Sequence, residues 1–288
     1  PYMPFLIAFF STLFITPLVI YFAKKYELVD DPKKRYHPAH VHKGIIPRAG
    51  GLAIFFGLFI SIILFLPLTT RTWAILGASG ILTIVGLLDD KKDVHPFIRL
   101  GPNLIAALIV IAAGVGIPYI TNPFTGGIID LSVWTYSFSL FGTHSIVILA
   151  DLFALIWIMW TMNIIGWSAG VDGQMPGFVT ISAVILGILS MRFSLQDPSQ
   201  SLVTLLAFIV AGAFFGFLPW NFYPQKIMPG YGGKTLAGFL LALIGILSYA
   251  KVGTALLVLG IPMIDAVYPL IRRISSKRLP VLAARGHL

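Results

Sequence analysis

The chain has 288 residues, of which 57% are hydrophobic and 11% are charged, and its net charge at pH 7 is +9. Soluble domains carry about 25% charged residues, so this composition excludes a water-facing surface over most of the chain and predicts a lipid environment. Cysteine is absent, which excludes disulfides and thiolate chemistry, and the basic residues lie in a few short segments that predict contact with a membrane surface and no nucleic acid.

Nine apolar segments predict an all-α polytopic membrane protein with a single domain over 1–288. A spanning helix needs about 20 mainly apolar residues. Between the fourth and fifth segments, residues 126–140 predict a small external hairpin with aromatic anchors at the membrane interface. In chain order, the predicted spans are 4–23, 50–66, 72–88, 100–117, 145–165, 178–191, 202–218, 235–249 and 252–270.

The distribution of lysine and arginine predicts the orientation in the membrane. These residues gather in the segments 24–48, 91–99, 226–234 and 272–285, whereas the opposite loops hold only Arg71, Arg192 and Lys251. The positive-inside rule makes the first set of segments cytoplasmic. We therefore expect a plasma (inner) membrane protein with its N-terminus outside and its polar chemistry at the cytoplasmic face.

An acidic pair, Asp89 and Asp90, follows the third predicted span directly. Carboxylates near a membrane are costly, so their position is informative. Adjacent carboxylates at a helix end can hold a hard cation such as Mg²⁺ or Mn²⁺ and help to bind phosphates. The same pair is also compatible with a solvated helix end that Lys91 and Lys92 neutralise.

Two glycine-rich loops lie on the same predicted face. The first, 163–177, contains Asp172 among glycines that allow the backbone to approach a ligand closely, although a plain turn between helices explains it too. The second, 221–235, ends in Gly-Lys-Thr at a helix start, where backbone N–H groups attract anions. It is not a P-loop, because the first glycine of that motif would fall on Met228 and no strand precedes it.

Two further polar segments allow more than one interpretation. His37, His40 and His42 could bind zinc, but histidines in a basic interfacial loop are more common. Asp265, a carboxylate inside an apolar segment, is expected to be paired, with Arg272 or Arg273 as its partner, or functional. Arginine clusters beside lipid headgroups often serve only as anchors.

In order along the chain, these segments resemble the polyprenyl-phosphate N-acetylhexosamine-1-phosphate transferases of glycosyltransferase family 4. The resemblance covers nearly the whole chain and rests on 31–51, 86–92, 163–173, 221–233 and 265–287. It implies a Mg²⁺-dependent reaction in which a polyprenyl phosphate such as undecaprenyl phosphate attacks the β-phosphate of a UDP-N-acetylhexosamine and UMP leaves. Such reactions supply cell-envelope glycans, including peptidoglycan. The Arg-Gly-His ending favours N-acetylglucosamine as the sugar.

The resemblance also implies roles for individual residues. Asp89 and Asp90 are expected at the metal and phosphate site, with His287 as a further catalytic residue at the start of a histidine-rich loop. A tenth span is expected after Leu288, so the chain would be a piece of a slightly longer protein, and a homodimer is compatible with the family. The candidates for substrate binding are Asn163, Asp172, Gly173, Asn221, Lys226, Lys234 and Arg285.

Several positions depart from the family pattern. Tyr231 stands where the family has aspartate, Lys234 stands where it has serine, and Gly166, Ala169 and Ala284 replace further polar residues. One hypothesis is that Lys234 supplies, as a point charge, part of the phosphate neutralisation that a fully liganded Mg²⁺ would give.

Two functions therefore remain open: a transferase, and a catalytically impaired relative that binds lipid phosphate or sugar nucleotide as a regulatory or scaffold protein. A transporter fits less well, because the ionisable residues lie at one face and no internal repeat is visible.

Overall fold

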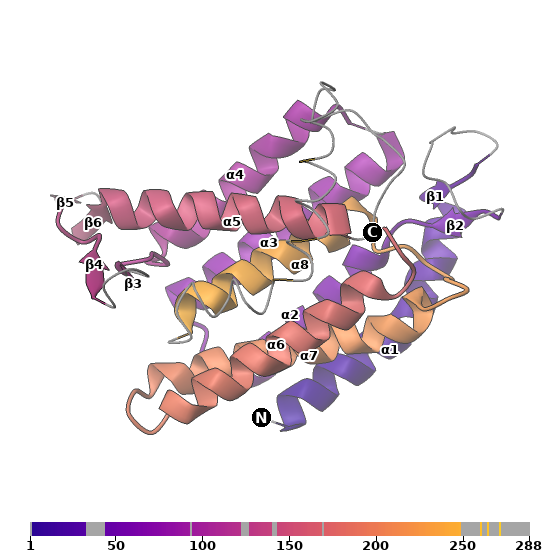
Figure 1. Ribbon diagram of the computed structural model, residues 1–288. Helices are drawn as coiled ribbons and strands as arrows, with labels where there is room; N and C mark the ends of the chain where they lie inside the picture. Colours follow the sequence, from indigo (N-terminus) through magenta and orange to yellow (C-terminus); the bar gives the residue numbers. More distant parts are fainter. Residues whose placement is uncertain are drawn as a thin grey trace.

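The computed structural model describes residues 2–32, 44–92, 94–121, 127–139, 143–168 and 170–248, together with positions 260, 264 and 271. Within these residues the chain forms eight helices and three small antiparallel strand pairs (Figure 1). The helices are α1 Tyr2–Lys25, α2 Gly50–Phe65, α3 Thr70–Lys92, α4 Pro96–Ala112, α5 Ile148–Ser168, α6 Gln174–Phe193, α7 Ser199–Asn221 and α8 Gly230–Leu247.

The predicted all-α polytopic membrane architecture is confirmed. By length and composition, six of the described helices can cross a membrane, namely α1, α3, α5, α6, α7 and α8. Helices α2 and α4 are apolar but shorter, at 16 and 17 residues. Eight predicted spans coincide with helices, while the ninth, 252–270, falls almost wholly outside the described residues, so the predicted count of nine stays a prediction.

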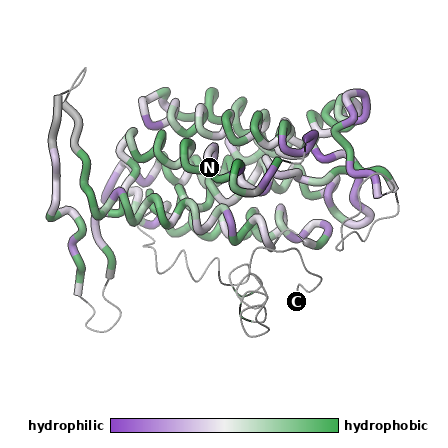
Figure 2. The backbone as a smooth tube through the Cα atoms, turned by 90° about the horizontal axis from the view of Figure 1, so that it is seen from above, coloured by the Kyte–Doolittle hydropathy of each residue, from purple (hydrophilic) through white to green (hydrophobic). Residues whose placement is uncertain are grey.

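Helix α8 forms the centre of the bundle. Its residues Leu236, Ala237 and 239–244 have no exposed surface, as expected for a helix that is apolar on all sides. It packs against α2, α3 and α5, while α1 and α6 pack on α7 (Figure 1). Hydrophobic residues run along the helices, and hydrophilic residues gather at helix ends and in loops (Figure 2).

Glycines bring the start of α8 against its neighbours. A Cβ added to Gly86 of α3 would clash with the backbone of Gly232, and one added to Gly51 of α2 would clash with the backbone of Gly233. Small residues of this kind let helix backbones approach closely inside membranes. The ends of α2 and α3 therefore lie directly beside the first turn of α8.

Short strands order two further regions. Strand β1 (Val29–Asp30) pairs with β2 (Ile46–Pro47), and this pair brings the segment after α1 to the start of α2. The predicted external hairpin is confirmed as a β segment, but it consists of two pairs: β3 (Tyr119–Thr121) with β4 (Ile128–Asp130), and β5 (Thr135–Ser139) with β6 (Thr143–Val147). These strands lie at the opposite end of the molecule from β1 and β2 (Figure 1).

The pairing between α4 and α5 differs from the sequence interpretation. The strand at 128–130 pairs with the strand before it, and the strand at 135–139 pairs with the one after it. The physical reason is a local turn, in which Asp130 Oδ1 accepts hydrogen bonds from the backbone N–H and the hydroxyl of Ser132, at 2.8 and 2.6 Å. Such Asx turns redirect the chain.

Candidate functional site

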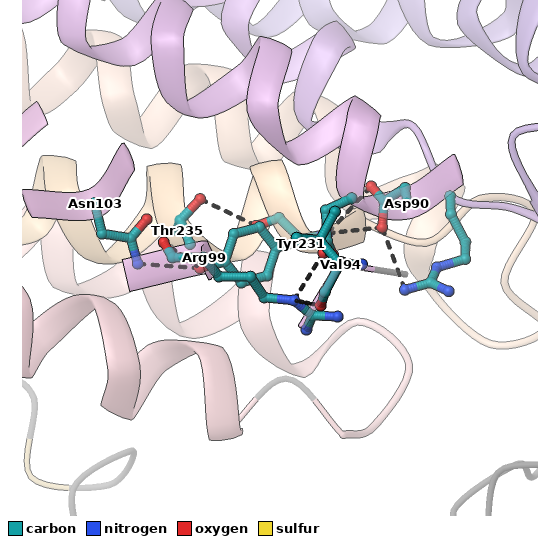
Figure 3. A network of polar contacts seen from close by, with 8 residues as sticks. Asp90, Val94, Arg99, Asn103, Tyr231 and Thr235 are labelled. Atoms are coloured by element: carbon teal, nitrogen blue, oxygen red, sulfur yellow. Dashed lines mark hydrogen bonds and ion pairs between the residues drawn. The ribbon is translucent and has the colours of Figure 1, made fainter. Parts of the chain in front are cut away.

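Four helix ends meet where the predicted acidic pair lies. Asp89 and Asp90 lie in the last turn of α3, and Arg48 lies two residues before the first residue of α2. Arg99 lies in the first turn of α4, and Tyr231 is the second residue of α8 (Figure 3). Residues that are distant in the sequence therefore form one polar cluster at the end of an apolar bundle.

Asp90 is buried and fully engaged by the protein. Its two carboxylate oxygens lie 3.0 and 3.2 Å from the backbone N of Tyr231. Its Oδ1 also lies 3.2 Å from Nη2 of Arg48, and only 2% of the Asp90 side chain is exposed. The carboxylate thus neutralises the positive end of the α8 dipole and holds a guanidinium group.

The backbone of α8 must come very close to allow this contact. Gly230 has a φ of +69°, and a Cβ at this position would clash with the Asp90 carboxylate and the Arg48 carbonyl. Only glycine meets both requirements without strain. The turn before α8 is therefore built around the acidic residue.

Asp89 has a different arginine partner. Its Oδ1 lies 2.7 Å from Nε of Arg99 and accepts a hydrogen bond from the backbone N–H of Val94 at 3.2 Å. Arg99 Nε also donates to the carbonyl of Val94, at 2.8 Å. The side chain of Asp89 is 2% exposed. Asp89 therefore ties the end of α3 to the start of α4.

Tyr231 fills the space beside Arg99. The guanidinium carbon of Arg99 lies 5.2 Å from the centre of the Tyr231 ring, within the range of a cation–π interaction. The Tyr231 hydroxyl accepts a hydrogen bond from Nδ2 of Asn103 at 3.1 Å (Figure 3). At this position the protein thus presents an aromatic ring and a neutral hydroxyl, and no carboxylate.

Lys234 lies one turn further along α8. The charges that act on its ammonium group are those of Arg48, Asp90, Arg99 and Asp30. Within the described residues Lys234 forms no hydrogen bond and no ion pair. Arg48 links the cluster to β1, because its Nη1 lies 3.9 Å from Oδ1 of Asp30.

A second group of predicted residues connects two loops by hydrogen bonds. Oδ1 of Asn221 accepts a hydrogen bond from the backbone N–H of Gly173 at 3.1 Å, and its Nδ2 donates to the carbonyl of Ile227 at 3.0 Å. Oδ2 of Asp172 lies 3.4 Å from the backbone N of Gln225. The structure therefore brings Asp172, Gly173 and Asn221 together, with their polar atoms used inside the protein.

The remaining candidates lie elsewhere. Asn163 donates a hydrogen bond to the carbonyl of Met159, 2.7 Å away within α5. Lys226 lies over the ring of Trp220, 5.1 Å from its centre, and lines a cavity of about 370 Å³ together with Lys24. Outside the described residues lie Asp265, Arg272, Arg273, Arg285, His287, Ala169, Ala284 and the three histidines His37, His40 and His42.

Sequence comparison with known proteins identifies the family. Residues 72–249, which run from the third residue of α3 to just past α8, match the family described as Glycosyl transferase family 4. The chain belongs to glycosyl transferase family 4.

Three relatives illustrate the range. The chain is 27% identical to the probable undecaprenyl-phosphate N-acetylglucosaminyl 1-phosphate transferase of Bacillus subtilis, over 99% of this chain and 75% of that protein. It is 30% identical to the decaprenyl-phosphate N-acetylglucosaminephosphotransferase of Mycobacterium leprae, over 96% and 73%. It is 27% identical to the phospho-N-acetylmuramoyl-pentapeptide-transferase of Limosilactobacillus reuteri, over 93% and 80%.

The described acidic side chains of this family member do not form the ligand set that the Mg²⁺ implied by the resemblance would need. In the described part of the chain, no three acidic, histidine or cysteine side chains are grouped so that they could hold a metal ion. Asp89 and Asp90 each face a guanidinium group, and position 231 contributes no carboxylate. Since Mg²⁺ requires near-octahedral oxygen ligands, these residues as arranged do not fit a resident Mg²⁺.

Three site residues were missed from the sequence of this family 4 protein. In the sequence, Arg48 belongs to the matched segment 31–51 and to the cytoplasmic charges but carries no assigned role, Arg99 reports orientation, and Asn103 lies in a predicted apolar span. A usable signal exists for two of them. Arg99 and Asn103 are four residues apart, so they share one face of α4, and both point to the same tyrosine.

Proposed function

We propose that the protein transfers N-acetylhexosamine 1-phosphate from a UDP-sugar to polyprenyl phosphate at the cytoplasmic face of the plasma membrane. The observation that carries the proposal is the cluster of Arg48, Arg99 and Lys234 around Asp89 and Asp90 at the end of an apolar bundle. Both substrates carry phosphate groups, which cations can neutralise. The polyprenyl chain of the lipid substrate also requires apolar helices that face the membrane. The names of the relatives support the same reaction class.

The proposed chemistry is a phosphoryl exchange. An oxygen of the lipid phosphate attacks the β-phosphorus of the UDP-sugar, and a new P–O bond forms. The bond from that phosphorus to the oxygen that bridges it to the α-phosphorus breaks, and UMP leaves with the electron pair. The lipid then carries a diphospho-sugar. Arg48, Arg99 and Lys234 are suited to neutralise the charge that develops on the phosphate oxygens, because fixed cations in a site of low polarity act strongly.

The sugar and the cofactor are part of the proposal. N-acetylglucosamine is the favoured sugar, because the Bacillus and Mycobacterium relatives are named for it. Mg²⁺ or Mn²⁺ dependence stays a prediction of the resemblance, and no step is assigned to the metal, because the described donors do not fit it. The homodimer and the orientation with the N-terminus outside are likewise proposals that rest on the family and on the positive-inside rule.

A transfer assay tests the proposal. Purified protein in detergent is incubated with undecaprenyl phosphate and radiolabelled UDP-N-acetylglucosamine, once with Mg²⁺ and once with EDTA. We expect labelled lipid and free UMP in equal amounts, and a Lys92→Gln control, which changes an exposed lysine beside the acidic pair, should behave like the wild type. The absence of labelled lipid with every UDP-N-acetylhexosamine under both conditions would refute the proposal.

A catalytically impaired relative is the second candidate. Two observations favour this function. Asp89 and Asp90 each form an ion pair with an arginine, and Tyr231 stands where the family pattern has a third aspartate. Such a protein would bind the lipid phosphate or the sugar nucleotide and regulate or scaffold a partner. Saturable binding of UDP-N-acetylglucosamine without UMP release would select this function over the first.

A further inference from the structure

The charged cluster is layered, with acids inside and cations outside. The side chains of Asp89 and Asp90 are each 2% exposed, whereas those of Arg48 and Arg99 are 18% and 25% exposed. A ligand that approaches this end of the bundle therefore meets guanidinium groups before it meets carboxylates. This order favours the approach of an anion. A cation that approached the carboxylates would first meet a guanidinium group of the same charge.

Lys234 and Arg48 keep N–H donors that the described residues do not use. Lys234 has three N–H donors, and within the described residues none of them forms a hydrogen bond or an ion pair. Arg48 directs Nη2 to Asp90, whereas its Nη1 is 3.9 Å from Asp30, beyond hydrogen-bond distance. A phosphate supplies the acceptors that these groups lack, and a metal ion supplies none.

Tyr231 reinforces this arrangement. Its ring lies against the Arg99 guanidinium, and Asn103 fixes its hydroxyl by a hydrogen bond. Its backbone N–H is directed to Asp90. Tyr231 therefore helps to position a cation and adds no negative charge that could attract a divalent ion.

We infer that Arg48 and Lys234 bind the pyrophosphate of the sugar nucleotide directly and without a metal ion, and that Asp89 and Asp90 act as positioning residues for the two arginines. The inference rests on the proposed function only in taking the pyrophosphate to be part of a sugar nucleotide. It holds equally for a transferase and for a binding protein that has lost turnover. The ligand class is a nucleoside diphosphate sugar, recognised through its diphosphate.

Calorimetric titration of the purified protein with inorganic pyrophosphate in EDTA tests the inference. We expect saturable binding in EDTA, weakened at least about tenfold by Lys234→Met, since a charge-assisted hydrogen bond contributes roughly this factor. Lys234→Met breaks no contact within the described residues, so it should leave folding intact. Arg48→Gln should weaken binding similarly, and Arg48→Lys, which keeps the charge, should restore part of it. The exposed Lys92→Gln is the matched control and should bind like the wild type.

A metal titration provides the second arm. Electron paramagnetic resonance with Mn²⁺ should detect no stoichiometric binding to the wild type, whereas Tyr231→Asp combined with Lys234→Ser should bind Mn²⁺ more tightly, because it adds a carboxylate and removes a cation. Pyrophosphate binding that requires Mg²⁺, or stoichiometric Mn²⁺ binding that Asp90→Asn abolishes, would overturn the inference. Neither result would change the expected outcome of the transfer assay. A failed transfer assay would likewise not change pyrophosphate binding in EDTA, so the two failures are distinguishable.

Discussion

The carboxylate of Asp90 accepts the backbone N–H of Tyr231 at 3.0 and 3.2 Å, so the last turn of α3 caps the first turn of α8. One acidic side chain thereby joins the most buried helix of the bundle to the polar end of another. The same carboxylate holds Arg48 at 3.2 Å. The packing of α8 and the position of the Arg48 guanidinium are thus linked through a single residue.

Replacement of Asp90 tests this link. Asp90→Asn removes the charge that the α8 dipole and Arg48 both require, and we expect a loss of about 3 kcal/mol in the free energy of unfolding, because a buried charge loses its partner. Thermal unfolding in detergent measures the effect. Glu27→Gln, an exposed carboxylate just after α1, should leave the melting temperature unchanged, and an equal shift in both variants would contradict the assigned role.

Glycine contacts offer a second test. Gly86→Ala places a Cβ against the backbone of Gly232, so we expect destabilisation of about 2 kcal/mol from overpacking. Gly77→Ala in the same helix meets nothing within 4 Å and should be neutral or slightly stabilising, because alanine favours a helix. Thermal unfolding of both variants measures the contrast. Equal behaviour would show that α3 and α8 are not in backbone contact.

The hydrogen bonds by which Asn221 connects two loops give a third prediction. Asn221→Ala leaves the backbone groups of Gly173 and Ile227 without their partner, so we expect a loss of about 1–3 kcal/mol in stability. Asn163→Ala removes only a bond to a helix carbonyl and should cost less. The binding of UDP-N-acetylglucosamine is also measured for both variants, because it separates a structural role of Asn221 from a role in binding. An Asn221 variant with wild-type melting and weakened binding would favour the binding role.

The helices were predictable from the sequence because lipid restricts the choices. Apolar segments of 20 residues in this composition have few alternatives to a spanning helix. Boundaries were less predictable: α4 begins at Pro96, where proline suits the first turn of a helix, and not at Leu100. Strands β3 to β6 form pairs of three and five residues, and pairs so short are decided by the turns between them.

The site was predictable only in its acids. Asp89 and Asp90 are conspicuous because carboxylates are rare in this chain. Arg48 stands in a matched segment without an assigned role, and Arg99 resembles an ordinary cytoplasmic anchor. Arg48 and Asp90 are 42 positions apart, and their ion pair depends on the glycine contacts that bring α2, α3 and α8 together. No local pattern encodes such a contact. Lys226 shows the converse, because a conspicuous lysine in a glycine-rich loop lies over Trp220.

A double-mutant cycle on Tyr231 and Asn103 tests how the tyrosine is held. Tyr231→Phe keeps the ring under Arg99 but removes the acceptor for Asn103 Nδ2, and Asn103 is 3% exposed. We expect a loss of about 1–2 kcal/mol, because a buried donor loses its partner, and a smaller loss when Asn103→Leu is added, because no polar group then remains unpaired. Tyr231→Leu also removes the cation–π contact with Arg99 and should therefore lose more stability than Tyr231→Phe. If the stability losses of Tyr231→Phe and Asn103→Leu simply added in the double variant, the Tyr231 hydroxyl and the Asn103 amide would not interact. The tyrosine would then be held by Arg99 and Asp90 alone.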